Sequence, residues 1–337
     1  MIGLAAEIDA NFVSLSVPGW AWIATIGVIL GLLLIDILVL HRTPKVPPVR
    51  RAALETLSWV LVGVAFGAAV IIGFGGKAGG EYFSGYLIEY SLSIDNVFVW
   101  ALILSFFKVP PQYQHRVLFW GIFGALILRA GFIFAGIAII ERFEFMLVVF
   151  GVFLLYTAAK LIVSDDDAVD PENSKFLKMV RKAVPSTNEF DGQKLFTRVD
   201  GRRFATPLFG VLLLVEITDV LFAVDSVPAV LAVSKEQFIV FTSNAFAIMG
   251  LRSLYFLLAD MHARFSYLQQ GLAIILAFVG IKMIIEYFNW YHIPTGLSLL
   301  VIGLVLVASV AFSLKKTRIS ADQINLPDES LPPHKAV

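Results

Sequence analysis

Three carboxylates lie close together inside a long apolar stretch of this 337-residue chain. Glu216, Asp219 and Asp225 fall in the run from about Ala205 to Val233, which is long enough to cross a bilayer. Each charged side chain at mid-membrane opposes insertion by about 2.5 to 3.5 kcal/mol, so three unpaired charges would oppose it by about 8 to 10 kcal/mol. Such a cluster indicates a functional site rather than a structural one.

A second acidic pair has the same spacing as the last two of these acids. Each copy is an acid, five residues, an aspartate, a small polar residue and a valine. The copies are Glu89, Asp95, Asn96 and Val97, and Asp219, Asp225, Ser226 and Val227. Carboxylates, an amide and a hydroxyl form an all-oxygen donor set, which suits Mg²⁺, Ca²⁺ or Mn²⁺. The predicted metal ligands are Glu89, Asp95, Asn96, Glu216, Asp219, Asp225 and Ser226.

Composition places these residues in an integral membrane protein, with 58% hydrophobic and 15% charged residues and a mean hydropathy of +0.82. Acidic and basic residues balance, so the charge gives no indication of a nucleic-acid partner. There is no cysteine, and the five histidines fall in predicted loops, span ends or the tail, which disfavours zinc, copper or haem at mid-membrane. We expect no tightly bound cofactor.

The fold class expected is an all-α membrane protein with about nine transmembrane helices, because the apolar runs show no period-two alternation. The spans are predicted at 20–40, 54–74, 83–107, 117–138, 143–163, 205–233, 237–258, 268–286 and 294–314. Residues 1–337 then form a single transmembrane domain, with a cytoplasmic linker loop at 164–204 and a cytoplasmic tail at 315–337.

Basic residues predict how the chain crosses the membrane. Most Lys and Arg residues fall in loops on one side, and only Lys77, Arg142 and Lys235 fall in loops on the other. The expectation is a multi-pass protein of the cell (inner) membrane with its N-terminus outside and its C-terminus in the cytoplasm. The bilayer is therefore one partner, and self-association into a homo-oligomer is left open.

Four further basic residues lie within or near the ends of spans. Arg129 and Lys160 are 31 residues apart, and Arg252 and Lys282 are 30 apart. The segments 83–163 and 205–286 thus each contain an acidic motif, then an arginine, then a lysine, in the same order. The copies are three spans apart and enter the membrane in opposite directions, which predicts two inverted three-helix repeats, as in many secondary transporters.

These basic residues have two interpretations. They are predicted to be counter-ions that neutralise the carboxylates when the site is empty, and the alternative is that they bind an anionic substrate. For Lys160 and Lys282, snorkelling to the membrane surface is a further alternative. Asp36 is expected to pair with the basic edge at His41-Arg42 rather than to transfer ions. Asn244 is equally a ligand or an interhelical hydrogen-bond partner.

Residues six apart on an ideal helix point about 120° away from each other, since each residue turns the chain by about 100°. Glu89 and Asp95, like Asp219 and Asp225, would not share a face. Either the helix is interrupted between them or the two acids serve successive positions on a path. Pro228 favours an interruption in the 205–233 span, because it lacks a backbone N–H.

Four strings of the sequence resemble the TerC family, and the nine-span layout is most similar to its Alx branch. The four strings are Glu89–Phe98, Ala205–Phe209, Glu216–Pro228 and Ser243–Phe256. The family is associated with tellurium resistance and metal-ion homeostasis, and its Alx-like members with manganese export. The resemblance implies that the ion is Mn²⁺, that transport is outward, and that the motif acids are Glu89, Asp95, Glu216, Asp219 and Asp225, with Asn96 and Ser226 beside them.

The function expected is therefore a secondary transporter that exports Mn²⁺ by rocking one repeat against the other. Proton-for-metal exchange is one form of it, since protons can neutralise the acids on the return step. An intramembrane aspartyl protease is disfavoured because the Gly-x-Gly-Asp pattern is absent, so the protein is not expected to be an enzyme. The alternative is an oxyanion transporter, or a scaffold for tellurite resistance that uses the intramembrane arginines.

Overall fold

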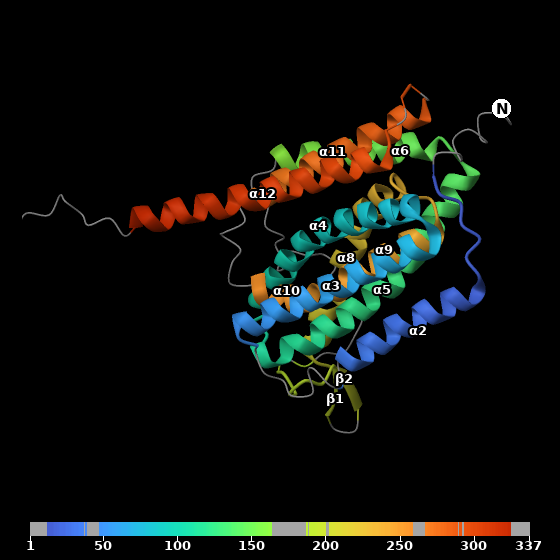
Figure 1. Ribbon diagram of the computed structural model, residues 1–337. Helices are drawn as coiled ribbons and strands as arrows, with labels where there is room; N and C mark the ends of the chain where they lie inside the picture. Colours follow the sequence, from blue (N-terminus) through green and yellow to red (C-terminus); the bar gives the residue numbers. More distant parts are fainter. Residues whose placement is uncertain are drawn as a thin grey trace, which may run out of the picture.

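The computed structural model describes residues 12–36, 38, 47–163, 187, 189–199, 202–258, 267–288, 290–291 and 293–324. This part of the chain is a bundle of helices with one small sheet (Figure 1). The helices are α2 (Gly19–Ile35), α3 (Val49–Phe74), α4 (Gly76–Phe106), α5 (Pro111–Arg142), α6 (Met146–Val163), α8 (Pro207–Leu231), α9 (Gln237–Met249), α10 (Leu251–Leu258), α11 (Leu268–Tyr287) and α12 (Thr295–Ile324).

The predicted helical membrane class is confirmed. In the described residues, seven helical segments are long and apolar enough to cross a bilayer, with α9 and α10 together forming one of them. The shorter apolar helices α2 and α6 occupy the two remaining predicted spans. Most helices begin or end within a few residues of the prediction. The largest differences are at α12, which ends at Ile324 instead of residue 314, and at α4, which begins at Gly76 instead of residue 83.

The end of the predicted 164–204 linker is not a plain loop but forms a β-hairpin, which was not predicted. Strands β1 (Phe196–Val199) and β2 (Arg202–Ala205) pair antiparallel, with Arg198 opposite Arg203. The intervening Asp-Gly dipeptide lies outside the described residues, but it is typical of two-residue hairpin turns and was the signal for this element. Most of the predicted linker, and of the tail at 315–337, lies outside what the structure describes.

The predicted interruption near Pro228 is also wrong. Helix α8 continues through Pro228, and α4 continues from Glu89 to Asp95. The break lies instead in the seventh span, where α9 ends and α10 begins on either side of Gly250. A Cβ at Gly250 would come within 2.9 Å of the Trp59 Cβ, so the glycine allows α3 to approach this joint closely.

Two groups of helices are visible in Figure 1. Helices α6, α11 and α12 lie along one side, and α3, α4, α5, α8, α9 and α10 form the larger group, with α2 at its edge. Within the larger group α4 packs against α8 and α9, and α5 packs against α8. Every residue from Thr242 to Tyr255 is buried, so the seventh span runs through the interior.

Candidate functional site

A buried arginine lies at the centre of the bundle. Arg129, near the middle of α5, is 1% exposed. Its guanidinium forms a two-pronged contact with Asp219 on α8, Nε donating to Oδ2 at 3.2 Å and Nη2 to Oδ1 at 2.9 Å. The Nη1 group donates to Glu89 Oε1 on α4 and to Ser226 Oγ at 3.3 Å. One cation therefore bridges the two carboxylates of the predicted site.

Asn96 completes the set of acceptors around this guanidinium. In the amide orientation that satisfies both of its ends, the Asn96 nitrogen donates to the Leu92 carbonyl at 3.1 Å and the Asn96 oxygen accepts from Arg129 Nη2 at 3.1 Å. An arginine has five N–H donors. All five then have acceptors among the described residues: two from Asp219 and one each from Glu89, Ser226 and Asn96.

The Glu89 carboxylate is held from several sides. It has no exposed surface, and its Oε2 accepts from Asn244 Nδ2 on α9 at 2.7 Å. Its Oε1 also accepts from Ser93 Oγ at 3.0 Å, one helical turn away. Asn244, whose role the sequence leaves open, thus joins the cluster through an interhelical hydrogen bond. Ser93 is not among the predicted ligands, although a serine four residues after a buried acid on a helix is well placed for this contact.

We call this group the central cluster: Glu89, Ser93, Asn96, Arg129, Asp219, Ser226 and Asn244. It joins α4, α5, α8 and α9, and its two carboxylates and one guanidinium carry a formal charge of −1. Each charged member lies near the middle of its helix, where water is scarce. Breaking such a buried pair is expensive because the remaining charge has no partner. The central cluster therefore holds the guanidinium of Arg129 firmly. It also has the oxygen atoms that could bind another cation in place of the guanidinium.

Two predicted ligands on α8 lie apart from the central cluster. The Glu216 carboxylate lies against Gly124 of α5, where an added Cβ would overlap it. Asp225 faces α6, where its Oδ1 accepts from Thr157 Oγ1 at 3.1 Å and the charge of Lys160 acts on it. Glu216 and Asp219 thus both face α5, whereas Asp225 faces α6.

The structure describes the backbone of Asp95 in α4, but its side chain lies outside the described residues. Among the residues described, no three Asp, Glu or His side chains converge closely enough to hold a metal ion. The predicted seven-residue ligand set therefore stays a prediction. Four of its members, Glu89, Asn96, Asp219 and Ser226, are together around Arg129.

The contact between Glu216 and Gly124 makes a testable prediction. Gly124→Ala should displace the Glu216 carboxylate with little loss of fold stability, since the overlapping atoms are the end of a movable side chain. Any flux that depends on Glu216 should fall, as measured by metal transport into proteoliposomes. Gly131→Ala on the same helix is the matched control, because an added Cβ there meets nothing within 4 Å. Equal effects of both variants would contradict a role for this contact.

The other predicted counter-ions lie away from the central cluster. Arg252 forms a buried ion pair with Asp36 at the end of α2. The predicted partners of Asp36, His41 and Arg42, lie outside the described residues. Lys160 is exposed, which agrees with the snorkelling interpretation.

Lys282 does not snorkel, because it is 1% exposed and pairs with Glu286 at 3.6 Å on the same helix. The snorkelling alternative is wrong for this residue.

A further buried acid on α4, Glu81, is not among the predicted site residues. Glu81 has no exposed surface and accepts from Ser234 Oγ at 2.7 Å and from the backbone N–H of Val13 at 2.8 Å. It was overlooked because the predicted span began at residue 83, which placed Glu81 in a loop. The position of Glu81 just before the apolar run that begins at residue 83 could have indicated that it lies on the same helix.

Comparison with known proteins finds related membrane proteins. Residues 74–321 match the integral membrane protein TerC family. An uncharacterized membrane protein of Myxococcus xanthus is 46% identical over 91% of this chain and 96% of its own length. The Alx protein of Escherichia coli, whose name proposes a membrane-bound redox modulator, is 42% identical over 86% of this chain and 91% of its own.

The chloroplastic thylakoid membrane protein TERC of Arabidopsis thaliana is 42% identical over 76% of this chain and 68% of its own length. No solved structure matches the chain. The family match covers well over half of the chain, including every residue of the central cluster. This chain belongs to the integral membrane protein TerC family.

Proposed function

We propose that this protein is a secondary transporter that exports divalent metal ions, with Mn²⁺ as its principal substrate, through the central cluster. The observation that carries the proposal is the bridge that Arg129 forms between Glu89 and Asp219. A buried cation between two carboxylates from different helices occupies the place that a metal ion would take. The arginine is then the counter-ion of the empty site, and metal entry requires its withdrawal.

Charge balance supports this exchange. With Arg129 in place the two carboxylates leave a formal charge of −1, and with a divalent ion instead of the guanidinium they leave none. Oxygen atoms of Asn96, Ser226 and Ser93 lie around the same carboxylates and could complete the coordination. Oxygen ligands of this kind suit Mn²⁺. Protons could take the place of the metal on the return step, which would couple export to the proton gradient.

Helix packing supports alternating access. In the proposed repeat, α4 corresponds to α8, α5 to α9–α10, and α6 to α11. The symmetry that relates the two repeats then converts the α4–α9 pair into the α8–α5 pair. It leaves the α4–α8 and α6–α11 pairs unchanged. All four pairs pack in the structure, as an inverted repeat requires. Transporters of this architecture bind substrate at the repeat interface near the midplane. Asp219, the thirteenth residue of the 25-residue helix α8, is at that depth.

Basic loop residues support the proposed orientation, with the N-terminus outside, the C-terminus in the cytoplasm and the protein in the cell (inner) membrane. The alternative of an oxyanion substrate is disfavoured by the saturation of Arg129. All five donors of that guanidinium already have acceptors within the protein. Since anion recognition by arginine uses those donors, we propose a cation as the substrate and no enzymatic activity.

The test is metal flux in proteoliposomes loaded with Mn²⁺, Ca²⁺, Mg²⁺ or Zn²⁺ in turn. We expect Mn²⁺ flux in the wild type and a loss of about tenfold or more in Asp219→Asn, since losing even an outer-shell partner of a metal ligand commonly lowers affinity or activity by about 10- to 100-fold. Asp191→Asn makes the same chemical change at a partly exposed site outside the spans and should keep wild-type flux. Equal flux in wild type and Asp219→Asn would contradict the proposal, and flux that ignores a pH gradient at fixed voltage would exclude proton exchange.

A further inference from the structure

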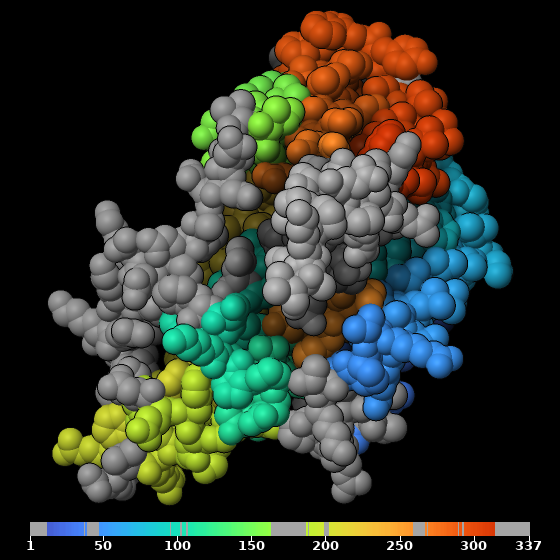
Figure 2. Space-filling model, turned by 90° about the vertical axis from the view of Figure 1, so that its left-hand side faces the viewer, coloured from blue at the N-terminus to red at the C-terminus, as the bar shows by residue number. Residues whose placement is uncertain are grey.

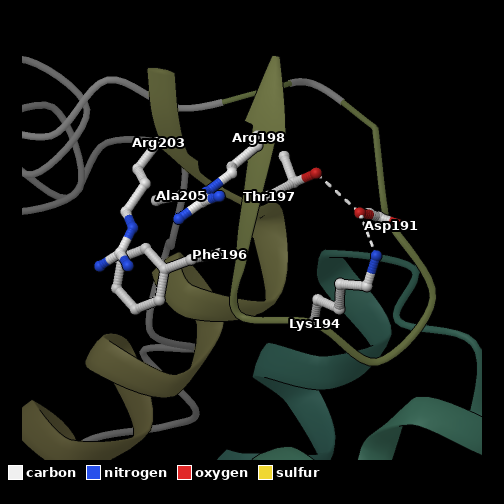
Figure 3. A pocket seen from close by; sticks show the side chains of 7 residues that line it. All are labelled: Asp191, Lys194, Phe196, Thr197, Arg198, Arg203 and Ala205. Atoms are coloured by element: carbon white, nitrogen blue, oxygen red, sulfur yellow. Dashed lines mark hydrogen bonds and ion pairs between the residues drawn. The ribbon is translucent and has the colours of Figure 1, made fainter. Parts of the chain in front are cut away.

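The β-hairpin presents two arginines on one face. Because side chains alternate along each strand and Arg198 is opposite Arg203, these two residues share a face with Phe196. Figure 3 shows them extending on the same side of the hairpin. They line a pocket of about 670 Å³ together with Asp191, Lys194, Thr197 and Ala205. Arg202 lies on the opposite face and does not line the pocket.

No carboxylate in the described residues neutralises the two arginines. Like charges directly opposite on paired strands repel each other, so this arrangement favours an anion between them. The one acid that lines the pocket is already engaged. Asp191 Oδ2 accepts from Thr197 Oγ1 at 2.7 Å and from Lys194 Nζ at 2.9 Å. Those two hydrogen bonds lower the pKa of Asp191 below its ordinary value, so this carboxylate stays ionised and paired with Lys194.

The position of the hairpin along the chain places it at the membrane surface. Ala205 ends β2 and Pro207 begins α8, a candidate span of 25 residues. At 1.5 Å per residue this helix is about 37 Å long, which exceeds a hydrocarbon core of about 30 Å. The residues just before α8 therefore lie at the depth of the lipid headgroups. Figure 2 shows the yellow hairpin projecting from the helical body at that end.

We propose that Arg198 and Arg203 bind the phosphate of an anionic phospholipid headgroup. Arginine binds phosphate oxygens through paired hydrogen bonds, and the membrane surface supplies such phosphates at high density. This inference goes beyond transport and does not depend on it.

The same site would hold the start of α8 in place. Phe196 packs against Phe209 of α8 with ring centroids 4.6 Å apart. Thr206 ties the helix to the segment before β1, its N–H donating to the Leu195 carbonyl at 2.9 Å and its Oγ1 to the Lys194 carbonyl at 2.6 Å. A lipid bound to the hairpin is therefore connected to the helix that carries Asp219.

The test is lipid retention by the full chain in nanodiscs, measured by native mass spectrometry. Discs of phosphatidylcholine alone are compared with discs that also contain phosphatidylglycerol. We expect the wild type to retain phosphatidylglycerol preferentially. Each of Arg198→Ala and Arg203→Ala should weaken that retention about tenfold, which corresponds to about 1.4 kcal/mol, because each arginine supplies charge-assisted hydrogen bonds to the phosphate. Arg202→Ala removes the same charge from the other face and should leave retention unchanged.

Three results would overturn the proposal. An equal loss in all three variants would indicate general attraction of the basic hairpin to the surface. Retention without preference for phosphatidylglycerol would exclude a headgroup site. Displacement of the lipid by millimolar inorganic phosphate would make the ligand a soluble phosphate. Because retention is measured without metal flux, a failure here leaves the proposed transport untouched, and a failure of transport leaves this result unchanged.

Discussion

Replacement of Arg129 by glutamine is expected to destabilise the folded protein by about 3 to 5 kcal/mol, the usual effect of breaking a buried ion pair. The variant leaves Glu89 and Asp219 as two negative charges in the interior. Glu89 keeps the neutral donors Ser93 and Asn244, and Asp219 loses both hydrogen bonds from the guanidinium. The substitution also removes five hydrogen bonds at once. The measurement is the thermal or denaturant unfolding of purified protein in detergent, compared with the wild type.

A second substitution separates charge from packing. Arg129→Gln combined with Asp219→Asn removes one of the two stranded carboxylates, so it should recover part of the lost stability while transport stays absent. Arg142→Gln, at the exposed end of the same helix, is the matched control and should stay within about 0.5 kcal/mol of the wild type. A single Arg129→Gln variant as stable as this control would contradict the buried bridge.

Replacement of Arg252 by glutamine is the second large expected effect, and it should be local. The Arg252–Asp36 pair connects α10 to the end of α2, and both side chains are buried. The beginning of α2 has a separate attachment, where Trp22 packs against Phe238 with ring centroids 5.1 Å apart. A loss of about 3 kcal/mol should accelerate amide exchange near Asp36 roughly a hundredfold and leave exchange around Trp22 unchanged.

The double-mutant cycle with Asp36→Asn gives the coupling between these two residues. If the pair is as described, Arg252→Gln combined with Asp36→Asn is more stable than Arg252→Gln alone, because no unpaired charge remains in the interior. Hydrogen exchange followed by mass spectrometry reports both the global and the local effect. Additive effects of the two substitutions would show that Asp36 and Arg252 act independently.

The helical framework was largely predictable from the sequence. Continuous apolar runs of about 20 residues require helices, because a bilayer leaves no other partner for the backbone. The same physics identified the residues that do not belong in lipid, among them Glu89, Arg129 and Asp219. A buried charge needs a partner, so a cation and acids inside neighbouring spans were expected to meet. The hydrogen bonds from Arg129 to both acids agree with the counter-ion interpretation.

Partner choice could not be predicted, because it depends on how distant segments pack. Asp36 lies 216 residues from Arg252, and the nearest basic residues in the sequence are at 41–42. Pro228 illustrates a different limit. It removes one backbone donor, but tertiary packing on both sides of α8 keeps the helix continuous. The joint at Gly250 lies in close contact with Trp59, which only the packed structure reveals.

The order in which the acceptors of Arg129 occur along the chain has a consequence for biogenesis. Polypeptides are made from the N-terminus, so Glu89 on α4 is available when Arg129 enters the bilayer on α5. These adjacent helices can insert as a hairpin in which the two opposite charges cancel. Asp219 follows 90 residues later and meets a guanidinium that is already in position. A charged span that is costly to insert alone can thus be integrated after its counter-charge.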